Sequence, residues 1–127
     1  MTDRSDIEGL LRGLYAARGR GDLNAVCACF TDDAVFQIAG ASNASPIAIK
    51  ANGVAEFRPW LTLMLKTFSL AEINILRLII DGDNAAGHWQ ARIHSRVTGA
   101  QVLTELVDIV RVRDGRICSY TEFFVPR

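Results

Sequence analysis

The chain has 127 residues, of which half are apolar, and its 14 basic side chains balance 14 acidic ones. This length suits a single domain, 1–127, which can bury roughly two thirds of its unfolded surface without disulfides. The even charge argues against nucleic acid and anionic membrane surfaces as partners.

Helical periodicity marks the first half of the chain. Apolar residues recur three and four positions apart over 5–18, which predicts an amphipathic helix. Asp22 can cap a second, short helix, and a strand is predicted over 34–39. The polar segment 40–46 is typical of a loop that rims a cavity, and a third helix is predicted over 54–67.

The second half changes to a strand pattern. Four β-rich runs, 72–80, 85–97, 101–113 and 116–125, are separated by short turns. Strands joined this tightly are antiparallel, so they predict a meander that the earlier strand can extend. The expected fold class is α+β, with about three N-terminal helices packed on a curved antiparallel sheet.

Cysteine usage indicates a reducing compartment. Cys27, Cys29 and Cys118 are an odd number, which fits reduced thiols better than disulfides. Charged residues interrupt the first apolar stretch, so we expect no secretory signal, and no apolar run is long enough to predict a membrane span. We expect a cytoplasmic protein.

The last predicted turn decides which side chains share a face of the sheet. A type I turn over 113–116, with Gly115 in the bulge position, would place Asp108 opposite Tyr120. By the two-residue period of a strand, Asp108, Tyr120 and Glu122 then lie together among apolar neighbours. A buried carboxylate is costly, so we expect a raised pKa for Asp108. A purely structural hydrogen bond between Asp108 and Tyr120 is the alternative.

The strand predicted over 85–97 alternates between two faces. One face carries apolar residues that we expect toward the pocket, and the other carries His88, Gln90, Arg92 and His94. We expect this second set on the convex face, where a homodimer would form.

No motif predicts a bound metal or cofactor. The histidines lack metal-ligand spacing, and there is no glycine-rich phosphate loop. Arg12, Arg18 and Arg20 lie among acidic residues and predict a solvated face rather than a nucleic-acid patch.

Four segments carry a resemblance to a known family. They are Leu14-Tyr15-Ala16-Ala17, Gly21-Asp22-Leu23, Phe30-Thr31-Asp32-Asp33-Ala34-Val35-Phe36 and Val107-Asp108-Ile109-Val110-Arg111-Val112-Arg113-Asp114-Gly115-Arg116-Ile117. With the order of elements, they make the chain resemble the nuclear-transport-factor-2-like superfold, in the branch of the ketosteroid isomerases and SnoaL-like polyketide cyclases. The resemblance implies a cone-shaped fold around an internal pocket. The superfold hosts several reactions and also binding domains, so function depends on the site.

Ketosteroid isomerases use an aspartate base opposite an oxyanion hole made of a tyrosine and a protonated aspartic acid. By this resemblance the tyrosine falls at Leu14, with Tyr15 one residue away, and the base falls at Ile38. The protonated acid matches Asp108. We therefore expect no classical steroid isomerisation, and the candidate catalytic residues are Asp108, Tyr120 and Tyr15.

Candidate ligand contacts come from the same faces and from the third helix. They are Phe36, Ile38, Trp60, Met64, Trp89, Ala91, Leu106, Val110, Glu122 and Phe124. The leading hypothesis is a small, largely apolar ligand with cofactor-free proton transfer of the isomerase, cyclase or dehydratase type, using Asp108. A non-catalytic ligand-binding or dimerisation module is the alternative, which the missing base at Ile38 favours. An adaptor that binds proteins through the exposed sheet face is a third possibility.

Overall fold

The computed structural model describes residues 3–40 and 47–126 and confirms the α+β class. The helices are α1 (Arg4–Arg20), α2 (Leu23–Ala28) and α3 (Val54–Thr67). The strands are β1 (Phe30–Gly40), β2 (Ile47–Asn52), β3 (Phe68–Asp81), β4 (Asn84–Ser95), β5 (Gln101–Arg113) and β6 (Arg116–Pro126). Strand β2 was not predicted, and the expected loop of 40–46 lies outside the described residues except for Gly40, which ends β1.

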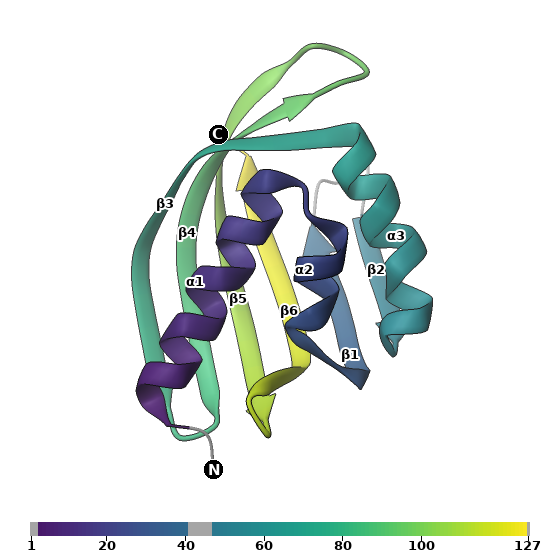
Figure 1. Ribbon diagram of the computed structural model, residues 1–127. Coiled ribbons are helices and arrows are strands. Elements are labelled where there is room, and N and C mark those ends of the chain that lie inside the picture. The colour runs from purple at the N-terminus through teal and green to yellow at the C-terminus, as the bar shows by residue number, and fades with distance from the viewer. Residues whose placement is uncertain (1–2, 41–46, 127) are drawn as a thin grey trace.

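The six strands form one sheet in the order β2-β1-β6-β5-β4-β3. The predicted antiparallel meander from β3 to β6 is confirmed. Strand β1 pairs with β6 in parallel, which makes the sheet mixed, and β2 pairs antiparallel with β1. Figure 1 shows that the sheet curves strongly, with α1 lying across it on the side of β3 and with α3 beside β1 and β2.

The turn between β5 and β6 differs from the prediction. Asp114 and Gly115 both have positive φ, 53° and 80°, as in the two-residue type I′ hairpin turn. A register irregularity follows along the pair, and Asp108 lies opposite Glu122 instead of Tyr120. Because the register differs by two residues, the three side chains stay on one face of the sheet.

The hydrophobic core lies between α1 and the inner face of the sheet. Ile7, Leu11 and Leu14 of α1 are almost fully buried, as their helical spacing predicts. Trp89 and Ala91 of β4 are fully buried opposite them. None of the described helices has the length and apolar character needed to cross a bilayer.

Candidate functional site

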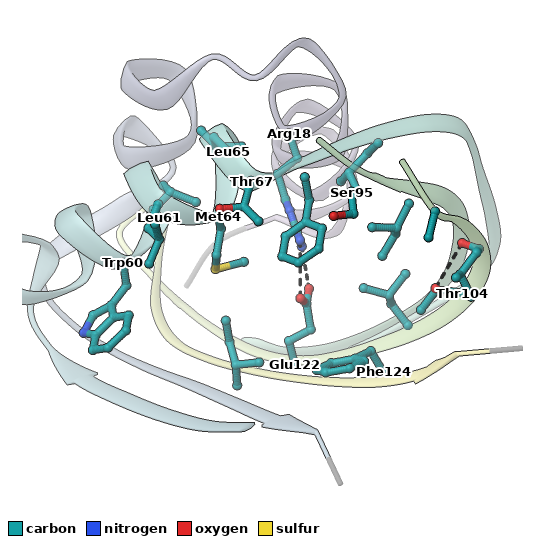
Figure 2. Close-up of a pocket in the computed structure, with 18 residues that line it drawn as sticks. Arg18, Trp60, Leu61, Met64, Leu65, Thr67, Ser95, Thr104, Glu122 and Phe124 are labelled. Carbon is teal, nitrogen blue, oxygen red and sulfur yellow. Dashed lines mark hydrogen bonds and ion pairs between the residues drawn. The ribbon is translucent and has the colours of Figure 1, made fainter. Parts of the chain in front are cut away.

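A cavity of about 470 Å³ lies between α3 and the curved sheet (Figure 2). Leu61 and Met64 of α3 line one side, and Leu106 and Phe124 of the sheet line the other. Trp60, which also lines the cavity, is 45% exposed, so it lies at the rim. Both the volume and the apolar wall are typical of a site for a small organic molecule.

One ion pair interrupts the apolar wall. Among the described residues that line the cavity, the charged ones are Arg18 of α1 and Glu122 of β6. Figure 2 shows these two side chains facing each other. Arg18 Nη1 lies 2.5 Å from Glu122 Oε2, and Nη2 lies 3.3 Å from Oε1. Burial alone would raise the pKa of Glu122, but the charge of Arg18 and hydrogen bonds lower it. Glu122 is therefore a carboxylate at neutral pH.

The position of Arg18 corrects the prediction of a solvated face. Arg12 and Arg20 do have exposed side chains, but that of Arg18 is only 9% exposed. Arg18 lies seven residues after Leu11 and four after Leu14, so it continues the buried stripe of α1. The helical spacing of the buried residues predicts a buried position for residue 18. We expected an exposed side chain there because arginine is charged.

Behind the ion pair lies a chain of buried hydrogen bonds. The Tyr120 hydroxyl lies 2.9 Å from Glu122 Oε2 and 2.6 Å from Asp108 Oδ2. Trp89 Nε1 donates to the same Asp108 oxygen at 3.0 Å. Asp108 is fully buried, and burial followed by the charge of Glu122 raises its pKa well above the ordinary value, as the sequence predicted.

Tyr15 closes the far end of this buried polar cluster. Its ring stacks on Trp89 with centroids 4.6 Å apart, and the Arg18 guanidinium lies 5.0 Å from the centroid of the same indole. The Tyr15 hydroxyl rests against Gly87, the strand partner of Asp108, where any Cβ would clash with it. The Tyr15 hydroxyl also faces Asp108, and burial, followed by the charge of Asp108 and a hydrogen bond to it, raises the pKa of Tyr15.

The structure separates the sequence-predicted residues into two groups. Those that line the cavity are Ile38, Trp60, Met64, Leu106, Glu122 and Phe124. Phe36, Trp89, Ala91 and Val110 are buried in the core instead. Of the candidate catalytic residues, Tyr120 lines a small void beside the cavity, whereas Asp108 and Tyr15 lie behind it.

Metal-ligating residues do not gather at the site. Over residues 3–40 and 47–126, no three His, Cys, Asp or Glu side chains are grouped so that they could hold a metal ion.

Three helices packed on a curved sheet around an apolar cavity define the ketosteroid-isomerase-like class of fold. The model of the SnoaL-like domain family matches residues 11–120. The chain therefore belongs to the SnoaL-like family. Comparison with curated proteins gives no match.

Several solved structures share this fold. A Bacillus subtilis protein, named provisionally as an isomerase, is 21% identical, with a TM-score of 0.85 over 98% of this chain and 90% of that chain. An LEH-like epoxide hydrolase from M. tuberculosis is 20% identical, with a TM-score of 0.76 over 95% of this chain and 84% of that chain. A Catenulispora acidiphila protein, solved in complex with trimethylamine, is 16% identical, with a TM-score of 0.74 over 89% and 82%.

Proposed function

We propose that this chain binds a small, largely apolar organic molecule in its cavity and catalyses a cofactor-free proton transfer on it. The observation that carries the proposal is the buried ion pair of Arg18 and Glu122 in a largely apolar wall. A ligand whose body fills the apolar space can place its polar group near this pair, which carries the charged groups of the described cavity wall. The reaction would be of the isomerase, cyclase or dehydratase type, since each of these moves a proton.

The ion pair also favours an uncharged ligand. Arg18 and Glu122 neutralise each other, so the cavity wall offers no spare charge to an ionic ligand. Moving an ion from water into such a wall is costly unless a partner compensates it. A carbonyl or hydroxyl group can instead exchange hydrogen bonds with the Arg18 N–H groups and with the Glu122 carboxylate.

Glu122 is the group that would take a proton from the ligand. Arg18 lowers its pKa, which makes it a weak base in water. A ligand that displaces water from the cavity strengthens this base, because removing solvent disfavours the charged form. Ile38 lines the cavity but offers no base, so we expect no classical steroid isomerisation.

Exchange of the α protons of 2-decalone in heavy water tests the proposal. Glu122 would take an α proton, the C–H electron pair would form an enolate, and a deuteron returned from the site would restore the ketone. We expect Glu122→Gln to lower the protein-dependent exchange rate, measured by ¹H NMR, about 10²–10⁴-fold. Binding is followed separately through the methyl resonance of Met64, which is easily assigned because the chain has two methionines.

Decalin-2-carboxylate serves as the charged control because it has the same skeleton. It should need at least about tenfold higher concentrations to shift the Met64 resonance, a difference of about 1.4 kcal/mol. Binding of 2-decalone without exchange would contradict proton transfer and support a non-catalytic binding module. The non-catalytic binding module is favoured by the position of Asp108, because this carboxyl group lies behind the cavity wall and does not line the cavity. Failure of 2-decalone to bind would contradict both.

The proposal includes a homodimer through the convex face of the sheet. Apolar side chains are exposed there on neighbouring strands: Ile109 is 49% exposed and Phe123 is 45% exposed. A second copy of the chain fits such a patch, because in a two-fold interface the patch of one copy contacts the same patch of the other copy. Arg92, on the same face, already pairs with Glu72 of its own chain and is a poor probe of the interface.

Phe123→Glu should convert the dimer to a monomer at micromolar concentration, because it buries two charges at the centre of an interface of about 1,600 Å². Light scattering measures the mass in solution. Val97→Glu is the matched control, since Val97 is 81% exposed in the turn between β4 and β5. A wild-type chain that is monomeric would contradict this part of the proposal.

A cytoplasmic location is also part of the proposal. All three cysteines are free, which fits a reducing compartment.

A further inference from the structure

The Tyr120 hydroxyl has two carboxyl neighbours but only one proton to donate. It lies within hydrogen-bond distance of two carboxyl oxygens, Asp108 Oδ2 at 2.6 Å and Glu122 Oε2 at 2.9 Å. A hydroxyl carries one proton and can donate to only one of them, whereas an ionised carboxylate can only accept. One of the two carboxyl groups must therefore be protonated, and it has two acceptors in reach: Tyr120 and the other carboxyl group, with which it is also in hydrogen-bond contact.

The position of Arg18 decides which carboxyl group holds the proton. Both terminal nitrogens of Arg18 contact the two oxygens of Glu122, the arrangement expected of a guanidinium and a carboxylate. Asp108 has no such bidentate contact with a cation, and its neighbours Trp89, Tyr120 and Tyr15 are uncharged hydrogen-bonding groups. The shortest contact, 2.6 Å between Asp108 Oδ2 and the Tyr120 hydroxyl, selects the arrangement in which Asp108 donates to Tyr120 and Tyr120 donates to Glu122.

We infer that Asp108, Tyr120 and Glu122 form a proton relay that holds one proton between two carboxyl groups. Asp108 stores the proton, and Tyr120 is the positioning residue that connects it to the cavity. In one transfer, the Asp108 Oδ2–H bond breaks as the Tyr120 oxygen gains that proton, while the Tyr120 O–H proton passes to Glu122 Oε2. Asp108 becomes the carboxylate and Glu122 becomes neutral, so the total charge is unchanged. The use of the relay on a ligand rests on the proposed function, but its existence does not.

The groups around Asp108 support this distribution of charge. Tyr15 and Arg18 face it from α1, Tyr120 and Glu122 face it from β6, and the uncharged Trp89 donates to it from β4. Besides burial, the charge of Glu122 raises the pKa of Asp108, whereas Arg18 lowers it. If Glu122 loses its charge, the field of Arg18 is no longer compensated. Asp108 should then release its proton more easily.

The test is a ¹³C NMR titration of the Asp108 carboxyl carbon in the ligand-free full chain. We expect Glu122→Gln to lower the titration midpoint of Asp108 by about 1–3 pH units, because it removes a negative neighbour and leaves Arg18 unpaired. Glu105→Gln is the matched control, since it removes the same charge from the strand of Asp108 but points to the other face of the sheet. It should leave the midpoint unchanged.

Tyr120→Phe separates a relay from simple proximity. In this background the effect of Glu122→Gln on Asp108 should be smaller, because the connecting hydroxyl is gone, and an effect of undiminished size would overturn the relay. If Glu122→Gln does not fold, the wild-type titration decides, since coupled carboxyl groups each report both titration steps. An unchanged Asp108 midpoint in Glu122→Gln, or an ionised Asp108 in the wild type at pH 7, would overturn the inference. Absence of 2-decalone exchange would affect the proposed function alone.

Discussion

Replacing Arg18 with methionine should lower the free energy of unfolding by about 3–5 kcal/mol at pH 7. Methionine preserves much of the buried volume but leaves the Glu122 carboxylate, which is 3% exposed, without its cation. An uncompensated buried charge costs far more than the pair contributes. Urea denaturation followed by circular dichroism measures the loss.

The pH dependence of Arg18→Met follows from the sign of the Glu122 shift. In the wild type the pKa of Glu122 is lowered, so its stabilising effect is present above its ordinary value near 4.3 and is lost as the pH falls through the folded value. In the variant, burial dominates and raises this pKa, so the penalty applies only above the ordinary value. The difference between variant and wild type should therefore shrink as the pH is lowered from 7 to about 4.

Two controls separate charge from packing in this experiment. The double variant Arg18→Met/Glu122→Gln removes both charges and should recover most of the stability. Arg12→Met breaks the exposed pair with Glu8 and should cost only roughly 0.5 kcal/mol. A double variant as unstable as Arg18→Met would show that lost packing of the arginine side chain is the main effect.

Trp89→Ala is expected to cost about 3–5 kcal/mol, the usual range for an aromatic side chain removed from a core. Trp89 is fully buried, stacks on Tyr15, lies beside the Arg18 guanidinium and donates to Asp108. Its loss would leave a cavity next to buried polar groups. The measurement is again the free energy of unfolding from urea denaturation.

Trp89→Phe is the matched variant because it keeps an aromatic ring and removes the indole N–H. It should cost about 1–3 kcal/mol, mainly the loss of a hydrogen bond to a buried acceptor. Equal losses in Trp89→Phe and Trp89→Ala would contradict the packing argument and would assign the whole effect to the bond with Asp108.

Local periodicity predicted most of the fold. The third helix and the four-strand meander were confirmed, although β3 begins at Phe68, before the predicted start at residue 72. The parallel pairing of β1 with β6 was not predicted, because its partners, such as Phe36 and Tyr120, lie far apart in the chain. Strand β2 was missed as well, because it is short and directly follows a polar segment with proline.

The candidate site was predicted from the alternation of side chains between the two faces of a strand. The exact pairing of residues across the strands contributed less. Asp108, Tyr120 and Glu122 share a face even though the turn and the register differ from the prediction. Arg18 was missed because its charge was given more weight than its place on the buried stripe of α1. Which face residues reach the cavity depends on the curvature of the sheet, and sequence periodicity carries no information on that.

The apolar wall of the cavity and its ionisable groups come from different parts of the chain. Much of the apolar wall comes from α3 and from the ends of β3 and β4, at the edges of the fold, whereas the ionisable groups come from α1 and the inner strands β5 and β6. Substitutions such as Met64→Ala or Trp60→Leu can therefore alter ligand size without disturbing Asp108 or Glu122. Such a division would let the range of ligands change while the buried ionisable groups keep their contacts.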